Sequence, residues 1–212
     1  GVGSLGLLIG AGRSQSMARI LSKPANEINA QAVQGELASH QSGLRALVSS
    51  ARPKEAQLNV TVESAMATVN AVRALARPAI FDLGHGLNAI TSKVQADLEK
   101  LIMVVEPNSV TLAMAREIIQ DIEAESGGGR INVVVVNRAQ SSLQTPWHEV
   151  ENILGRDVKA IISAAPELAF QATENKMPMV LLQPTAIVSG QFIKLAEDMK
   201  SRIKSIAGGP PQ

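Results

Sequence analysis

The stretch AIFDLGHG, residues 79–86, decides the fold because an apolar segment in it ends in an acid and a glycine-containing turn. Buried parallel strands have short, continuous apolar sequences, and their carboxyl ends face the crevice in which α/β proteins bind ligands. An acid there can hold a metal-bound water, and a glycine lets the following loop move toward a phosphate. Asp82 and Gly86 are therefore candidate site residues, although an acid in this place also suits a simple strand-end cap.

Other segments of the chain also have strand character. IMVV at residues 102–105 and VVVV at residues 133–136 are continuous apolar runs, which are typical of strands covered on both faces. Such strands belong to a parallel sheet. The predicted strands are Gly43–Ser49, Pro78–Asp82, Leu101–Glu106, Ile131–Asn137 and Val158–Ile162.

Helical patterns lie between and after these strands. Apolar residues recur at helical spacing, and Ser109 is a suitable N-cap for the second long helix. The predicted helices are Ser16–Leu21, Val62–Ala76, Ser109–Glu125, Trp147–Leu154 and Ile187–Ile206. Strands that alternate with helices indicate βαβ units and a doubly wound sheet. We expect one domain over residues 1–207 and a flexible tail at 208–212.

The composition excludes several classes of site. Twenty basic and nineteen acidic residues give a net charge of +1, so no strong field attracts nucleic acid or an anionic membrane. The chain has no cysteine, which excludes disulfides and thiolate sites, and aromatic residues make up only 2%, too few for base-stacking platforms. No apolar run approaches the roughly 20 residues that span a bilayer, and the chain begins without a basic leader. We expect a soluble, cytoplasmic protein.

Two further polar pairs follow predicted strands. Asn137 and Arg138 end one strand, where the amide can pair with a purine edge and the arginine can stack, or where both simply form a polar strand exit. Pro166 and Glu167 lie in the loop after the last strand, where they either line a base pocket or turn the chain. GVGSLG, residues 1–6, matches GxGxxG, but no strand precedes it and no lysine follows its glycines, so we expect neither a dinucleotide site nor a phosphate loop there.

Taken in order, these segments resemble the MinD/ParA superfamily of ATPases with deviant phosphate loops, and among them the TadZ/CpaE-like proteins of pilus assembly and localisation. Residues 79–86 are similar to the family's Walker B and switch II element, and residues 104–107 and 135–138 are similar to its two following strands. The resemblance implies a three-layer α/β/α sandwich of the P-loop NTPase-like, SIMIBI type. It also implies ATP and Mg as cofactors, a homodimer, and pilus or secretion machinery as partner. The nucleotide-binding residues that it implies are Asp82, which would also contact the metal, Gly86, Asn137, Arg138, Pro166 and Glu167.

The sequence departs from this family at its start. In the family, a phosphate loop with two lysines and the second strand precede the segment that is similar to residues 3–10 of this chain. We therefore expect an incomplete or degenerate ATPase domain with no catalytic residue of its own and no hydrolysis by these 212 residues. A sheet without its first central strand exposes pairing edges and apolar surface, which predicts an unstable or oligomeric chain.

The function that the resemblance favours is a nucleotide-responsive or degenerate ATPase-like scaffold that positions a pilus or secretion assembly. The alternative is a ParA-like DNA-partitioning ATPase that binds DNA nonspecifically. The basic residues of the last helix are interrupted by Glu197 and Asp198, and the net charge is close to zero, which argues against DNA binding. A MinD-like membrane switch would require a basic amphipathic end, and residues 207–212 (AGGPPQ) do not form one.

Overall fold

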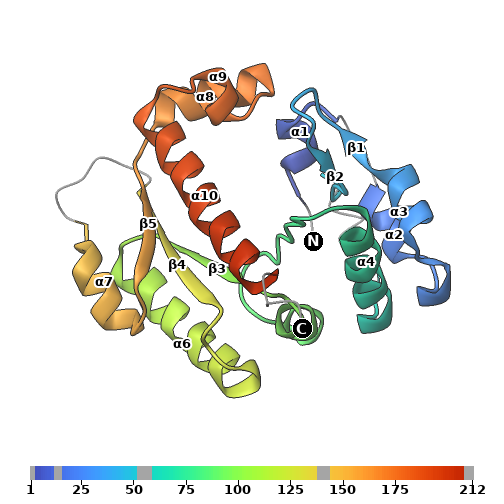
Figure 1. Cartoon of the computed structure of the whole chain (residues 1–212), viewed down its shortest axis with the longest axis horizontal. Helices are drawn as coiled ribbons and strands as arrows, with labels where there is room; N and C mark the ends of the chain where they lie inside the picture. Colours follow the sequence, from blue (N-terminus) through green and yellow to red (C-terminus); the bar gives the residue numbers. More distant parts are fainter. Residues whose placement is uncertain (1–2, 12–15, 52–58, 138–143, 208–212) are drawn as a thin grey trace. The chain divides into compact units, whose positions relative to one another are not determined.

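The structure, a computed structural model, describes residues 3–11, 16–51, 59–137 and 144–207, with the backbone alone for residues 201–207 (Figure 1). Its contacts divide the chain into two compact units, Gly1–Leu98 and Glu99–Gln212. The tail predicted at residues 208–212 lies outside the described residues. The prediction of one domain over residues 1–207 stays a prediction.

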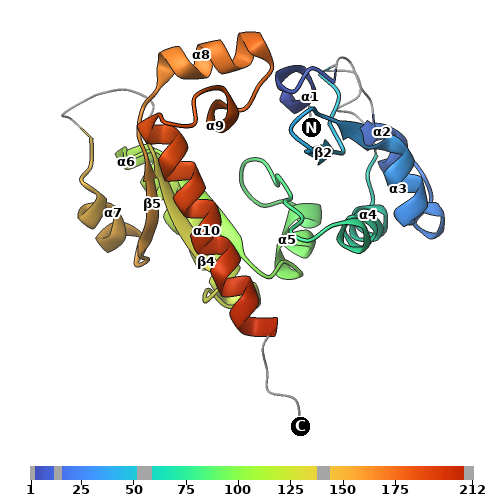
Figure 2. The same ribbon diagram turned by 45° about the horizontal axis from the view of Figure 1, so that its top comes forward.

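The first unit consists of helices and one short hairpin (Figure 2). The hairpin pairs β1 (Ala38–Ser39) with β2 (Arg45–Ala46) in antiparallel orientation. The helices are α1 (Leu5–Leu8), α2 (Ser16–Leu21), η1 (Ala25–Glu27), α3 (Ala30–Glu36), α4 (Val62–Leu75) and α5 (Ala89–Ala96). The predicted helices over 16–21 and 62–76 are therefore confirmed, the second to within one residue.

Helix α4 contributes to both apolar clusters of the first unit. Val72 and Leu75 pack against a cluster that contains the fully buried Ile20 and Val33. Val69, earlier on α4, belongs to a second cluster that reaches α5. The apolar residues of this helix thus contribute to two small cores.

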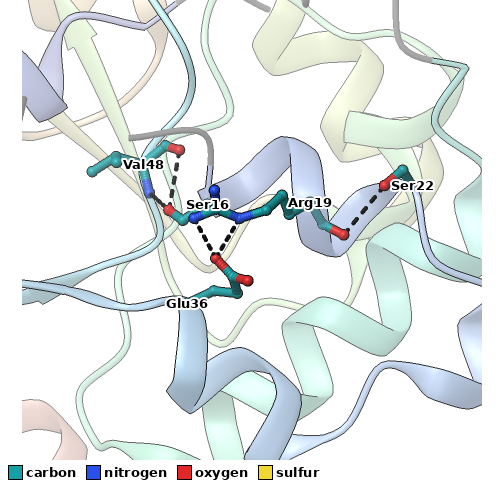
Figure 3. A network of polar contacts seen from close by, with 5 residues as sticks. All are labelled: Ser16, Arg19, Ser22, Glu36 and Val48. Atoms are coloured by element: carbon teal, nitrogen blue, oxygen red, sulfur yellow. Dashed lines mark hydrogen bonds and ion pairs between the residues drawn. The ribbon is translucent and has the colours of Figure 1, made fainter. Parts of the chain in front are cut away.

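A buried serine connects α2 to the segment after β2 (Figure 3). Ser16 Oγ accepts a hydrogen bond from the Val48 N–H at 2.9 Å and donates one to the Val48 carbonyl oxygen at 3.3 Å. Both residues are almost completely buried, so water cannot replace these contacts. Nearby, Arg19 forms an ion pair with Glu36 at 2.7 Å, but the arginine is more than half exposed and the pair contributes little to stability.

The second unit contains a parallel sheet in the order β3 (Leu101–Val105), β4 (Ile131–Val136), β5 (Val158–Ile162). Its register pairs Leu101 with Ile131 and Val105 with Val135. The three strand predictions in this half of the chain are confirmed. The predicted ends of β3 and β4 are each one residue too long, and both predicted ends of β5 agree with the structure. The helices of the unit are α6 (Ser109–Ser126), α7 (Trp147–Leu154), α8 (Pro166–Asn175), α9 (Met179–Leu182) and α10 (Ile187–Ala207).

Helices cover both faces of this sheet, so the second unit is a three-layer α/β/α sandwich (Figures 1 and 2). On one face, Val134 and Ile162 pack with the start of α10 and with residues of α8 and α9. The alternating residues Val133 and Val135 face the other side, where α6 and α7 lie. The fold class is thus confirmed as α/β with a parallel sheet. The buried stripe of α6 consists of Leu112, Ala115, Ile119 and Ile122, which recur at helical spacing as expected of the predicted helix.

The ends of α6 follow the predicted chemistry with one change. The N-cap is Asn108, whose side-chain oxygen accepts from Thr111 N at 2.9 Å, and Ser109 is the first helical residue. Asn and Ser are equally good N-caps, so the sequence did not show which of the two adjacent residues, Asn108 or Ser109, would be the cap. At the other end Gly127 has φ +76°, a conformation that favours glycine.

Two predicted strands in the first half of the chain are wrong. Pro78–Asp82 contains no strand, and Ile80 within it is 92% exposed. Of the predicted strand Gly43–Ser49 only Arg45–Ala46 is a strand, and it belongs to the antiparallel hairpin instead of a parallel sheet. The sequence pattern of an extended apolar segment gives no information about its partner, and a strand forms only where a neighbour satisfies its backbone groups.

Among the described residues, no helix is long and apolar enough to cross a membrane.

Candidate functional site

Asn137, one of the candidate residues from the sequence, lies where the carboxyl ends of β4 and β5 meet. Asn137 follows β4 directly, and its backbone N–H donates to the carbonyl oxygen of Ile162, the last residue of β5, at 2.9 Å. The residue is half-buried, and within the described part of the chain its side-chain amide makes no hydrogen bond. An amide in this state offers one donor and one acceptor to a ligand at the sheet edge, the pair that a purine edge requires.

A second pair of side chains borders the same edge. Ser163, the first residue after β5, donates its backbone N–H to Gln191 Oε1 at 2.8 Å, and Gln191 Nε2 donates to Ser163 Oγ at 2.9 Å. Gln191 lies in the first turns of α10, so the pair fixes the end of β5 to this helix. Because the Asn137 N–H bonds to the residue just before Ser163, the pair also helps to fix the backbone from which the Asn137 amide extends.

Pro166 and Glu167 follow Ser163 in the chain, and the structure places them in a helix instead of the predicted loop. They form the first turn of α8, both are exposed, and the N-cap Ala165 makes no side-chain capping bond. Proline suits this position because its missing N–H would have no helical partner, and a glutamate there interacts favourably with the helix dipole. The prediction that they contact a base stays a prediction. Arg138, the remaining residue predicted near the base, lies outside the described residues.

Asp82 and Gly86 belong to the first unit. Phe81 and Leu83 pack against the cluster formed by α4 and α5, so Asp82 between them is exposed. Its Oδ1 accepts from the Gly84 N–H at 2.9 Å, an Asx turn that holds the carboxylate at the head of the glycine loop. Gly86 has φ +70°, which side-chain-bearing residues rarely adopt, and the loop ends at Asn88, the N-cap of α5.

The structure thus gathers Asn137 with the end of β5 and places Asp82 and Gly86 together in one loop. These two groups lie in different units, so the expectation that Asp82 and Asn137 bind one nucleotide stays a prediction. That prediction also relied on Asp82 ending a strand, and this part of it is wrong because residues 78–82 form none.

The Asn137 group and the Asp82 group can each be compared with one part of a Mg-nucleotide, the base for Asn137 and the metal for Asp82. The Asn137 amide suits the base, as described above. The second carboxylate oxygen of Asp82 makes no hydrogen bond within the described residues and can accept one from a metal-bound water. In the same residues no group of three or more acids or histidines forms a metal site, but Mg²⁺ is commonly held by one or two carboxylates together with phosphate oxygens.

Sequence reasoning missed Ser163 and Gln191. A weak signal existed for the serine, since it is the first polar residue after the apolar strand Val158–Ile162, where α/β proteins place ligand contacts. For Gln191 there was none, because a glutamine in the first turns of a long helix is an ordinary surface residue until tertiary structure brings a partner to it.

Known proteins were compared with the chain by sequence and by structure. The sequence matches no protein-family model, and no curated protein matches it significantly. By structure it is similar to a ParA family ATPase from Chlorobium tepidum TLS, with a TM-score of 0.81 and 19% identity, over 92% of this chain and 80% of that one. The cell division ATPase MinD of Pyrococcus furiosus gives a TM-score of 0.78 and 17% identity, over 94% of this chain and 81% of that one.

A third similar structure is the septum site-determining protein MinD from Pyrococcus horikoshii OT3, solved in complex with Mg-ADP. Its TM-score is 0.72 at 16% identity, over 93% of this chain and 79% of that one. The chain has the fold of the ParA and MinD ATPases. At these identities, 16–19%, the similarity establishes the fold alone.

Proposed function

We propose that this chain is a nucleotide-responsive or degenerate ATPase-like scaffold of the MinD/ParA superfamily, which positions a pilus or secretion assembly in the cytoplasm as TadZ/CpaE-like proteins do. The observation that carries the proposal is the half-buried Asn137 amide, which has no hydrogen-bond partner within the described residues and lies at the carboxyl edge of a ParA/MinD-type sheet. A polar side chain in that condition is costly unless a ligand or water satisfies it.

The proposal assigns a scaffold role and no hydrolysis to these residues. Phosphoryl transfer requires positive groups on the β- and γ-phosphates, and no lysine follows a glycine-rich turn in the sequence. Asp82 would contact Mg²⁺ through water, and Gly86 would let its loop respond to nucleotide. Asn137, Arg138, Pro166 and Glu167 would line the base. Proteins of the pilus or secretion machinery and a second copy of the chain would be its partners, as the resemblance implies.

Isothermal titration calorimetry with Mg-ATP tests the nucleotide part of the proposal. We expect a dissociation constant of about 1 mM or weaker, which corresponds to about 4 kcal/mol of binding free energy or less, because the chain would contact the base without gripping the phosphates. Mg-ATP and Mg-ADP should bind equally, since no group of the chain is expected to grip the γ-phosphate. Micromolar binding of Mg-ATP, or a clear preference over Mg-ADP, would contradict this account.

DNA partitioning is the second candidate function, because the resemblance to ParA-like ATPases implies it as the alternative. A gel shift with nonspecific duplex DNA at low salt separates the two, because binding through phosphates weakens steeply as salt rises. We expect no salt-dependent shift, since Glu197 and Asp198 are exposed among the basic residues of α10 and the net charge is +1. A shift at low salt that disappears at high salt would favour partitioning.

A further inference from the structure

The contact between Ser163 and Gln191 fixes the direction of a side-chain hydrogen bond. A backbone N–H can only donate, so the amide atom of Gln191 that faces the Ser163 N–H at 2.8 Å must be the oxygen, Oε1. The other amide atom, Nε2, then faces Ser163 Oγ at 2.9 Å and can only donate to it. Ser163 Oγ is therefore the acceptor in this bond, and its own hydrogen must point elsewhere.

Buried contacts in the first turns of α10 keep Gln191 opposite Ser163. Val188, three residues before Gln191, is buried and packs in one cluster with Ile162, the last residue of β5. Ser189 is completely buried, and its Oγ donates to the Gln183 carbonyl oxygen at 2.7 Å. The start of the helix is thus anchored before any ligand arrives. A ligand at the end of β5 would meet a Ser163 hydroxyl that is already oriented, which lowers the entropic cost of binding.

The oriented hydroxyl belongs to the same edge of the sheet as the Asn137 amide. The Asn137 N–H donates to the carbonyl oxygen of Ile162 at 2.9 Å, and Ser163 is the next residue after Ile162. In the part of the chain that the structure describes, neither the Asn137 side chain nor the Ser163 hydrogen has a partner. The edge therefore offers the donor and the acceptor of one amide together with a second donor, whose direction Gln191 sets.

We propose that the Ser163 hydroxyl is a further contact to an adenine base and that Gln191 is the positioning residue that presents its hydrogen. This inference rests on the proposed function, because it adds a contact to the same base site. Adenine presents an acceptor, a donor and an acceptor in order, at N7, N6 and N1. An amide that pairs with the donor and one acceptor leaves the other acceptor for the hydroxyl hydrogen. Guanine has a different order, two acceptors at N7 and O6 followed by the N1 donor.

Gln191→Glu tests the proposal, because it reverses the side-chain bond without removing it. One oxygen of the new carboxylate still accepts from the Ser163 N–H. The other oxygen cannot donate, so the Ser163 hydrogen turns inward to it and a ligand meets only lone pairs. In an NMR titration of the whole chain, we expect the dissociation constant of adenosine to rise about threefold to tenfold. Inosine, whose N1 carries a hydrogen, should bind unchanged, and because both nucleosides are uncharged the added negative charge does not repel them.

Three further measurements separate this role from a purely structural one. Gln120→Glu makes the same chemical change at an exposed position of α6 and should bind adenosine as the parent does. In Gln191→Glu the Ser163 backbone amide should exchange as in the parent, because its acceptor oxygen remains, and faster exchange would contradict the reversed bond. Ser163→Ala should weaken adenosine binding by a similar factor. The double variant should weaken it no further, since both changes remove the same hydrogen from the ligand.

The failure of this inference is distinguishable from the failure of the proposed function. If adenosine shifts the Asn137 side-chain amide but binds Gln191→Glu as tightly as the parent, the inference is overturned and the base site remains. Equal weakening of adenosine and inosine would overturn it as well, because it would show a general loss of structure. If neither adenosine nor Mg-ATP shifts the Asn137 amide of the parent, the proposed function fails and this inference fails with it.

Discussion

Leu112→Ala is expected to destabilise the second unit by about 2–5 kcal/mol. Leu112 is 1% exposed and lies in the stripe of α6 that covers the sheet. Removing its terminal carbons loses the transfer free energy of those atoms and leaves a cavity that the rigid strand beneath cannot fill. Alanine is the better helix former, but that gain is only a few tenths of a kcal/mol and does not change the sign.

The chain provides its own probe for this measurement. Trp147 is the single tryptophan and begins α7 in the same unit, so its fluorescence during urea unfolding reports the second unit. Val110→Ala, two residues earlier on the exposed side of α6, is the control and should change the unfolding free energy by no more than about 0.5 kcal/mol. If the two variants unfold alike, α6 does not cover the sheet as described.

Ser16→Ala is expected to destabilise the first unit by about 1–3 kcal/mol, a large effect for the loss of one oxygen atom. The Val48 N–H would lose its acceptor Ser16 Oγ, and no water can reach it because both residues are almost completely buried. The Val48 carbonyl oxygen would keep its bond from the Met17 N–H at 3.1 Å. The cost therefore comes from one buried donor and should appear locally.

Amide hydrogen exchange followed by NMR measures this directly. In Ser16→Ala the Val48 amide should exchange about five-fold to 150-fold faster than in the parent, the range that corresponds to about 1–3 kcal/mol. Ser22→Ala is the matched control, because Ser22 Oγ donates to the Arg19 carbonyl oxygen on the exposed side of α2. Unchanged protection of Val48 in Ser16→Ala would show that the serine does not hold this segment.

The sequence alone predicted the second half of the fold well, because local patterns determine it. The apolar runs of β3, β4 and β5 are long, the helices between them are amphipathic, and Gly127 and Gly155 mark helix ends. In the first half the strand prediction at 78–82 failed. Ile80 has the sequence surroundings of a buried strand residue and is 92% exposed, since burial depends on a partner strand that the pattern does not encode.

The candidate site could be predicted only in part for a related reason. Asn137 was identified because it follows a buried strand, and the structure places it beside the end of β5. Gln191 was missed because its role comes from a contact with Ser163, 28 residues away in sequence. Long-range contacts of this kind leave no periodic signal, and the same is true of any relation between Asp82 and Asn137.

The most direct test of the central claim, that the Asn137 edge recognises a base, is an NMR titration of the whole chain with Mg-ATP. The account predicts shifts of the Asn137 side-chain amide and the Ser163 backbone amide, with an affinity of about 1 mM or weaker, and loss of the Ser163 shift in Asn137→Ala. Val110→Ala should titrate as the parent does. A titration that leaves Asn137 and Ser163 unmoved, or a Ser163 shift that persists in Asn137→Ala, would contradict it.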